Sequence, residues 1–222
     1  MTLTCLRMAK KLVFLNPVSD QLLESLNKND LLNVSCEPII SIEKVSFDSQ
    51  LLDPKIPWVF TSKTAVNAVK QYPFPKTVYC VGKETSKNIP NAKVPKTSTA
   101  KELAELIVES KEKHVIFICG DKRRSELPNI LISNKIQIQE VVVYKTLNLK
   151  KSVNLHDIDG LAFMSPSAVH SLHENGGFSG LPCFAIGATT ADALKSLGQK
   201  YVISEQSNAK SIVDAAHQYF VK

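Results

Sequence analysis

Two stretches of the chain repeat each other, and this repeat restricts the possible folds more than any other feature of the sequence. Phe60-Thr61-Ser62-Lys63-Thr64-Ala65-Val66 matches Phe163-Met164-Ser165-Pro166-Ser167-Ala168-Val169, with Phe, Ser, Ala and Val at equivalent places. The match resumes further along, where Val81-Gly82-Lys83-Glu84-Thr85 parallels Ile186-Gly187-Ala188-Thr189-Thr190. An internal repeat of this kind predicts two related domains. Each is expected to contain a strand-Ser-helix unit followed by a strand-Gly-helix unit.

Short apolar runs alternate with segments of helical periodicity along the whole chain. Each run is followed by a turn residue or a small polar residue, which is typical of a buried strand. The predicted strands are Lys11–Leu15, Trp58–Phe60, Thr77–Val81, Val115–Cys119, Gly160–Met164 and Cys183–Ile186. Helices are predicted over Asp20–Leu26, Ala100–Ser110 and Ser167–Glu174. Regular alternation of strand and helix predicts parallel sheets flanked by helices, which is an α/β fold.

Capping residues indicate where two of the helices begin and end. Thr99 stands three residues before Glu102, which is the capping-box pattern at the start of the 100–110 helix. Thr190 precedes a helix predicted over Ala191–Leu197, and Gly198 follows that helix as its terminator.

The two copies of the repeat do not supply equal numbers of strands. The second copy, after about Leu149, offers only three strand candidates, whereas Lys11–Ser35 offers a strand, a helix and a further short strand. We therefore expect a discontinuous domain of residues 1–36 and 148–222 around an inserted domain of residues 45–139. Residues 37–44 and 140–147, rich in Ile and Val, would join them as a two-stranded β-ladder hinge. The predicted fold is two doubly wound parallel-sheet domains.

Composition excludes several classes of protein. An apolar fraction of 44% with 22% charged residues is ordinary for a folded protein and argues against disorder. No stretch approaches the roughly 20 apolar residues needed to span a bilayer, and Met1–Lys10 lacks a secretory signal. A cytoplasmic location is therefore expected. The scattered cysteines predict neither disulfides nor a zinc site, and three of them lie within predicted strands as small buried side chains: Cys80, Cys119 and Cys183.

The net charge of +6 favours an acidic partner, which in principle includes nucleic acid, an anionic membrane surface or a polyanionic small molecule. The lysines are spread along the chain without interleaved aromatic residues, so nucleic acid is not the expected partner. Charge alone does not choose between the membrane surface and the small molecule. The alternative that the excess lysine only maintains solubility stays open.

Small residues follow the predicted strands at the edge where parallel sheets bind ligands. Backbone N–H groups at such strand ends can hold an anion without a specialised side chain. These small residues are Thr61, Ser62, Gly82, Gly120, Ser165 and Gly187, and cations lie beside them at Lys63, Lys83 and Lys122–Arg124. The alternative is that Ser and Gly only make turns and caps. The sequence contains no nucleophile elbow, no clustered metal ligands and no phosphate-binding loop.

Six motifs, in matching order and spacing, resemble the uroporphyrinogen-III synthases. They are Val59-Phe60-Thr61-Ser62, Cys80-Val81-Gly82, Cys119-Gly120-Asp121-Lys122-Arg123-Arg124 with Leu127-Pro128 after it, Val143-Tyr144-Lys145-Thr146, Phe163-Met164-Ser165-Pro166-Ser167-Ala168-Val169 and Ala185-Ile186-Gly187-Ala188-Thr189-Thr190-Ala191. The resemblance extends from about Lys11 to the C-terminal helix. It implies two α/β domains joined by a two-stranded ladder.

The resemblance also implies a reaction, that of a carbon–oxygen lyase of heme biosynthesis. Linear hydroxymethylbilane loses its terminal hydroxyl as water, and the resulting azafulvene-like cation attacks ring D at its substituted carbon. A spiro intermediate then rearranges, so that ring D is inverted in the product uroporphyrinogen III. No cofactor or metal is required.

The resemblance assigns substrate contacts by motif position. They transfer to Thr61, Ser62, Gly82, Ser165, Gly187, Thr189 and Thr190, and their neighbours Lys63, Thr85, Gly120, Arg123 and Ser167 complete the predicted binding set. Tyr144 is the predicted catalytic residue, because in the family this tyrosine stands near the ring D end of the ligand, where its phenol can assist the departing hydroxyl. The alternative is a tyrosine packed against the hinge.

Two other functions compete with this prediction. A non-enzymatic module of two lobes that closes on an anion would explain the fold and the charge, but not the set of motifs. A phospho-receiver domain needs paired acids after its first strand, where this chain has Asn16.

Overall fold

Hydrogen bonding groups the strands of the computed structural model into two five-stranded sheets, within the residues that the structure describes, 9–27 and 32–221. Each sheet belongs to one of two units with dense internal contacts. Unit 1 comprises Met1–Ser41 and Leu147–Lys222, and unit 2 comprises Ile42–Thr146. The chain therefore passes between the units twice, within the segments predicted as crossings. The expectation about a signal in Met1–Lys10 falls mostly outside the described residues.

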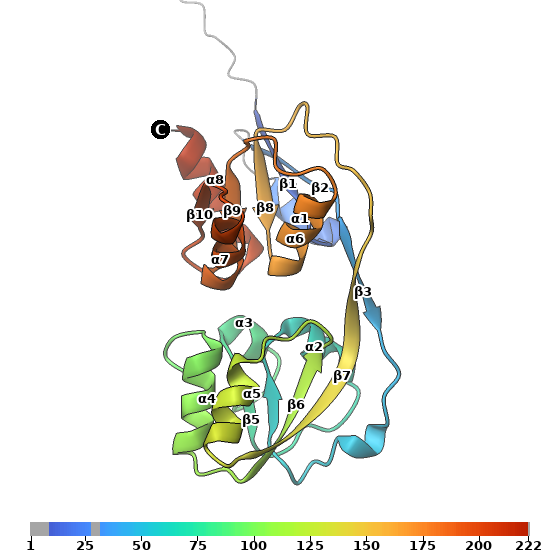
Figure 1. Cartoon of the computed structure of the whole chain (residues 1–222), viewed down its shortest axis with the longest axis vertical. Coiled ribbons are helices and arrows are strands. Elements are labelled where there is room, and N and C mark those ends of the chain that lie inside the picture. Colours follow the sequence, from blue (N-terminus) through green and yellow to red (C-terminus); the bar gives the residue numbers. More distant parts are fainter. Residues whose placement is uncertain (1–8, 28–31, 222) are drawn as a thin grey trace, which may run out of the picture. The chain divides into compact units, whose positions relative to one another are not determined.

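Unit 1 contains a sheet in strand order β10-β9-β8-β1-β2, with every neighbouring pair parallel (Figure 1). Its elements are β1 (Lys10–Phe14), α1 (Asp20–Leu26), β2 (Leu32–Cys36), β8 (Gly160–Phe163), α6 (Pro166–Glu174), β9 (Cys183–Ala185), α7 (Ala188–Ser196), β10 (Tyr201–Ile203) and α8 (Ala209–Val221).

Helices cover both faces of this sheet because successive strand residues point to opposite sides. Leu12 and Phe14 pack with α1 and α8, whereas Val13 and Leu15 pack with α6 and α7. All four side chains are buried, as the continuous apolar run predicts for a strand covered on both faces.

Unit 2 contains a sheet in strand order β3-β7-β6-β4-β5, in which β5, β4, β6 and β7 are parallel. Its elements are β3 (Ile40–Lys44), η1 (Ser49–Leu51), β4 (Trp58–Phe60), α2 (Lys63–Val69), β5 (Val78–Cys80), α3 (Lys83–Ser86), α4 (Ala100–Glu109), β6 (His114–Gly120), α5 (Glu126–Ser133) and β7 (Gln137–Asn148). Phe60 packs on the side of α2, and Val59 packs on the side of α4 and α5.

The crossing strands β3 and β7 are neighbours in the second sheet. Val45 N–H donates to Val143 O at 3.1 Å, and Leu149 N–H donates to Ile39 O at 2.9 Å. One residue number falls as its partner's rises, so the two segments run antiparallel. β7 is longer than the predicted crossing, since from Gln137 it also pairs with β6.

The repeat is visible as a shared strand order. The series β8-α6-β9-α7-β10-α8 of unit 1 corresponds to β4-α2-β5-α3 followed by a bridge from Tyr79 to Lys93 and then α4. The series β1-α1-β2 likewise corresponds to β6-α5-β7. The predicted α/β class with parallel sheets is confirmed.

One predicted cap is wrong and two are confirmed. Thr190 does not begin α7, because Gly187 in an extended conformation is the N-cap and Thr190 lies buried inside the helix. Glycine allows the chain to enter the helix directly from the strand end, so the helix starts three residues earlier than predicted. Thr99 caps α4 by accepting the Glu102 N–H, and Gly198 follows α7 with a φ of +70°. No helix in the described ranges is long and apolar enough to cross a membrane.

Candidate active site

Each sheet has one point at which the chain changes the direction in which it adds strands. In unit 1 the chain continues from β1 to β2 on one side, and from the neighbouring strand β8 to β9 on the other side. In unit 2 the neighbours β4 and β6 likewise lead to β5 and to β7. The loops after two such strands separate, and the crevice between them is where open parallel sheets bind ligands. The repeated serines Ser62 and Ser165 lie in these loops.

The unit 2 crevice brings two of the predicted residues together. Ser62 is the N-cap of α2, and its Oγ accepts the Ala65 N–H at 3.1 Å. The Tyr144 hydroxyl on β7 forms a hydrogen bond with the same Oγ, also at 3.1 Å. Tyr144 thus reaches past β6 to the loop after β4, and its phenol lies at the switch point of the sheet.

A β-bulge and a glycine explain how Tyr144 reaches this position. In the β6–β7 ladder Cys119 pairs with Val142, but the next residue, Gly120, pairs with Tyr144. The extra residue in β7 shifts the register, and such bulges change the direction in which a side chain points. A Cβ on Gly120 would lie 2.4 Å from Cε2 and from Cζ of the Tyr144 ring. The missing side chain at position 120 therefore leaves the space that the ring occupies.

The protonation state of Tyr144 follows from its surroundings. Burial raises the pKa of its phenol above the ordinary value, the Ser62 hydrogen bond lowers it, and the nearby charge of Asp121 raises it. The net direction is upward, so the phenol keeps its proton at neutral pH. A protonated phenol at this position can donate a hydrogen bond to a ligand oxygen.

The unit 1 crevice uses a different partner for its serine. Ser165 caps α6, and its Oγ accepts a hydrogen bond from Asn16 Nδ2 at 2.9 Å. Asn16 Oδ1 in turn accepts the Met164 N–H at 2.7 Å. Asn16 is only 6% exposed, and it was not among the predicted site residues. The sequence feature that could have identified Asn16 is an isolated amide directly after a buried apolar run.

Each of the two repeated glycines lies near a serine further along the chain. Gly82 and Gly187 are N-caps without a side-chain hydrogen bond of their own. Ser98 Oγ lies 2.6 Å from where a Cβ of Gly82 would stand, and Ser207 Oγ lies 3.6 Å from the corresponding point of Gly187. Ser98 precedes Thr99, the N-cap of α4, and Ser207 precedes Asn208, which lies directly before α8. Neither serine was among the residues predicted from the sequence.

The remaining predicted residues differ in accessibility. Thr85 and Thr190 are buried, Thr61 and Ser167 are partly buried, and Lys63 and Thr189 are exposed.

Arg123 has a partner within the protein. Its Nε donates to Glu140 Oε2 at 2.6 Å, and this hydrogen bond raises the pKa of the Arg123 guanidinium. Its charge is therefore balanced by Glu140 rather than unopposed, and a substrate carboxylate would compete with Glu140 for it.

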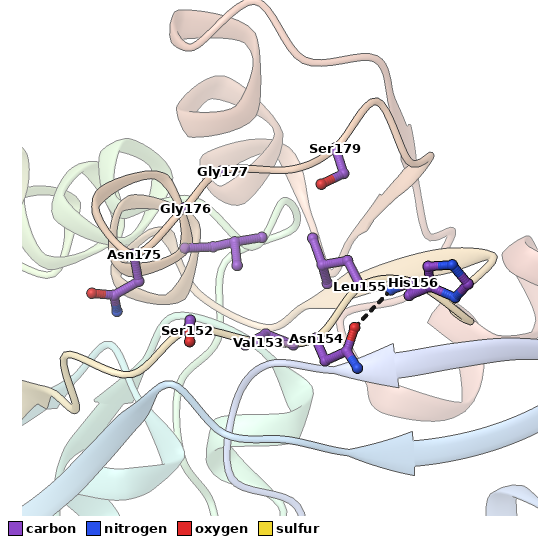
Figure 2. A pocket seen from close by; sticks show the side chains of 10 residues that line it. Ser152, Val153, Asn154, Leu155, His156, Asn175, Gly176, Gly177 and Ser179 are labelled. Atoms are coloured by element: carbon purple, nitrogen blue, oxygen red, sulfur yellow. Dashed lines mark hydrogen bonds between the residues drawn. The ribbon is translucent and has the colours of Figure 1, made fainter.

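A pocket of about 310 Å³ lies in unit 1 (Figure 2). It is formed by the loop before β8 and the loop after α6, and it is lined by Ser152, Val153, Asn154, Leu155, His156, Leu172, Asn175, Gly176, Gly177 and Ser179. Both loops lie at the amino end of β8, whereas Ser165 lies at its carboxyl end. None of the predicted site residues lines this pocket.

The buried thiols have the properties of core side chains. Burial raises the pKa of Cys80, Cys119 and Cys183 to about 12, so they are protonated and unreactive at neutral pH. Among residues 9–27 and 32–221, no three His, Cys, Asp or Glu residues are grouped so that they could hold a metal ion.

Solved structures of similar fold come from two bacteria. A mutant uroporphyrinogen III synthase from Thermus thermophilus is 17% identical with a TM-score of 0.66, covering 96% of this chain and 99% of that chain. Uroporphyrinogen-III synthetase from Helicobacter pylori is 18% identical with a TM-score of 0.61, covering 95% of this chain and 99% of that chain. At this identity the likeness shows the fold alone. No curated protein matches the chain in sequence.

A family model decides the relationship. The model for uroporphyrinogen-III synthase HemD matches residues 20–214, which is most of the chain and includes both copies of the repeat. The match confirms the resemblance found in the motifs. The chain belongs to the HemD uroporphyrinogen-III synthase family.

Proposed function

We propose that this protein is a uroporphyrinogen-III synthase, a lyase that closes hydroxymethylbilane into uroporphyrinogen III with loss of water and inversion of ring D. The family match over residues 20–214 is the observation that carries the proposal. The product serves heme biosynthesis. We further propose that the enzyme works as a monomer in the cytoplasm, without nucleic acid or membrane.

Strand-end backbone donors are proposed to hold the substrate's carboxylates. The positions are those at the switch points and at the helix N-caps Gly82 and Gly187. Gly187 is partly exposed, whereas Gly82 is buried beside Ser98. The net charge of +6 favours a polycarboxylate at long range. Binding that depends on many backbone donors fixes the geometry of a flexible linear tetrapyrrole, and geometry decides which isomer forms.

Tyr144 is proposed to assist the departure of the terminal hydroxyl. The carbon–oxygen bond breaks as the pyrrole nitrogen supplies electrons, and the leaving oxygen must gain a proton to depart as water. The Tyr144 phenol retains its proton at neutral pH and already takes part in a hydrogen bond with Ser62. It therefore donates a hydrogen bond to the leaving oxygen, which takes up a proton from solvent and departs as water. The positive charge is then on the azafulvene-like cation, and a proton is released again when ring closure is complete.

The test is to supply hydroxymethylbilane and determine which uroporphyrinogen isomer forms. Uroporphyrinogen III above the uncatalysed rate is expected from the wild-type chain. Only the type I isomer at the uncatalysed rate would refute the enzyme proposal. It would favour the rival function, a non-enzymatic module that binds a polycarboxylate without converting it.

The role of Tyr144 is tested separately with Tyr144→Phe, which removes the hydroxyl and keeps the ring. We expect a loss of turnover of about 100-fold or less, with type III still the product. Tyr201→Phe is the matched control, because Tyr201 lies exposed at the start of the edge strand β10. Unchanged turnover in Tyr144→Phe, with Tyr144→Ala destabilised, would assign Tyr144 to packing.

A further inference from the structure

Asp121 follows directly after β6, and both its backbone and its side chain bond to β7. Its N–H donates to the Tyr144 carbonyl oxygen at 3.1 Å. Its Oδ1 accepts the Thr146 N–H at 3.0 Å. One exposed aspartate thus holds β7 on both sides of Lys145, immediately after the residue that carries the phenol.

This contact lies beside an interruption of the β6–β7 ladder. The register shift opposite Cys119 and Gly120 interrupts the regular hydrogen bonding of β6 with β7, and a bulged strand bends and twists at such a point. β6 ends at Gly120, so no further β6 residue pairs with Thr146. Without another acceptor, the Thr146 N–H would bond only to water, and the strand after the bulge would have fewer constraints.

The ring of Tyr144 tolerates little displacement. On one side the ring fills the space where a side chain of residue 120 would stand, and it lies against the Gly120 backbone. At its end the phenol has the Ser62 bond at 3.1 Å. A change in the path of residues 144–146 would move the ring out of that space or lengthen the Ser62 contact, so the placement of the phenol depends on the backbone that Asp121 fixes.

We propose that Asp121 is a positioning residue, whose carboxylate fixes the β7 backbone after the bulge so that the Tyr144 phenol stays over Gly120 and within reach of Ser62. The effect on turnover rests on the proposed role of Tyr144, whereas the effect on the position of the ring does not. The negative charge of Asp121 also helps to keep the phenol protonated.

The test compares Asp121→Ala, which removes the acceptor, with Asp121→Asn, which keeps an acceptor oxygen at the same place. Asp121→Glu displaces the carboxylate by one methylene and replaces the alanine variant if that does not fold. Asp48→Ala is the matched control, because Asp48 is an exposed aspartate of the same unit whose Oδ1 accepts one backbone N–H, that of Gln50 at 2.9 Å.

Two readouts do not depend on activity. The chain has five tyrosines, so the ¹³C-tyrosine NMR spectrum is simple, and Tyr144→Phe identifies the Tyr144 signal. Hydrogen exchange of the Thr146 amide reports on the bond to Asp121 itself. We expect Asp121→Ala to shift the Tyr144 signal toward that of an exposed tyrosine and to speed Thr146 exchange. Asp121→Asn and Asp48→Ala should leave both close to wild type.

Activity gives the third readout. Asp121→Ala should lower kcat by no more than Tyr144→Phe does, with KM nearly unchanged, and Asp121→Asn should restore most of it. The double variant Asp121→Ala/Tyr144→Phe should be no slower than Tyr144→Phe alone, since both act through one phenol. An unmoved Tyr144 signal in Asp121→Ala, or losses that multiply in the double variant, would overturn the proposal. A shifted signal with full turnover in Tyr144→Phe would support positioning and refute the chemical role of Tyr144.

Discussion

Gly120→Ala is the substitution that tests the geometry of the site most directly. The backbone of Gly120 is not in the left-handed region, so an alanine there is not strained by its own φ. The new Cβ would lie 2.4 Å from two ring carbons of Tyr144, whereas ordinary contact begins at 3.4 Å. The ring must therefore move by at least the difference, 3.4 − 2.4 = 1.0 Å. A movement of that size breaks the 3.1 Å bond to Ser62.

The expected cost combines three terms. Loss of one neutral hydrogen bond costs about 0.5–1.5 kcal/mol, and overpacking of this kind costs about 1–3 kcal/mol. A Gly→Ala change at a compatible backbone position stabilises the fold by about 0.4–1 kcal/mol, because alanine lowers the conformational entropy of the unfolded chain. We expect the free energy of unfolding to fall by about 0.5–4 kcal/mol, with a central value near 2 kcal/mol. Turnover should fall toward that of Tyr144→Phe.

Urea unfolding and turnover measure these effects, and a double-mutant cycle identifies their cause. In Gly120→Ala/Tyr144→Ala the methyl enters the space that the ring has left, so the cost of Gly120→Ala should largely disappear. Gly187→Ala is the control for stability, because its Cβ would lie at an ordinary 3.6 Å from Ser207 Oγ. If the cost of Gly120→Ala persists unchanged in the Tyr144→Ala background, the proposed relation between the glycine and the ring is refuted.

Single contacts give three further predictions. Ser62→Ala removes the cap of α2 and the partner of Tyr144, so urea unfolding should show a loss of about 1 kcal/mol and turnover a modest decrease; abolished activity with the fold intact would instead require a catalytic hydroxyl. Partly buried Cys36 should react with alkylating reagents before the three fully buried thiols, as mass spectrometry can follow, and equal rates would contradict their burial. Burial raises the pKa of Tyr79 to about 12, above its unfolded value near 10, so the folded state retains this proton and stability should fall as pH rises from about 10 to 12. Tyr79→Phe should make that fall less steep, and an identical slope would contradict the assignment.

The elements that the sequence predicts well are those set by local pattern. Residues Leu12–Leu15 are all apolar because helices cover both faces of their strand, and such a run indicates a buried strand without knowledge of its neighbours. Ser62 and Ser165 emerged from the repeat, because equivalent strand ends use the same cap. Each of these features depends on residues close together in the sequence.

The features that the sequence does not reveal depend on contacts between distant segments. Asn16 and Ser165 are 149 positions apart, and nothing in either neighbourhood predicts their hydrogen bond. Strict alternation from Val141 and Val143 would place Tyr144 on the opposite face of β7. The bulge places it on the face of Ser62 instead, and a bulge of this kind has no sequence signature in β7.

The two units share a strand order but differ at the residue that ends the equivalent central strand. In unit 1 this strand is β1, and the amide of Asn16 just beyond it bonds directly to Ser165. In unit 2 it is β6, which ends at Gly120 and leaves room for a side chain from the next strand to reach Ser62. An amide held by two hydrogen bonds within the protein fixes the loop, whereas a phenol with a raised pKa can also donate to a ligand. We therefore propose that the repeated frame supplies similar anion-binding edges in both units, and that the change at one strand end confines the proton-donating chemistry to unit 2.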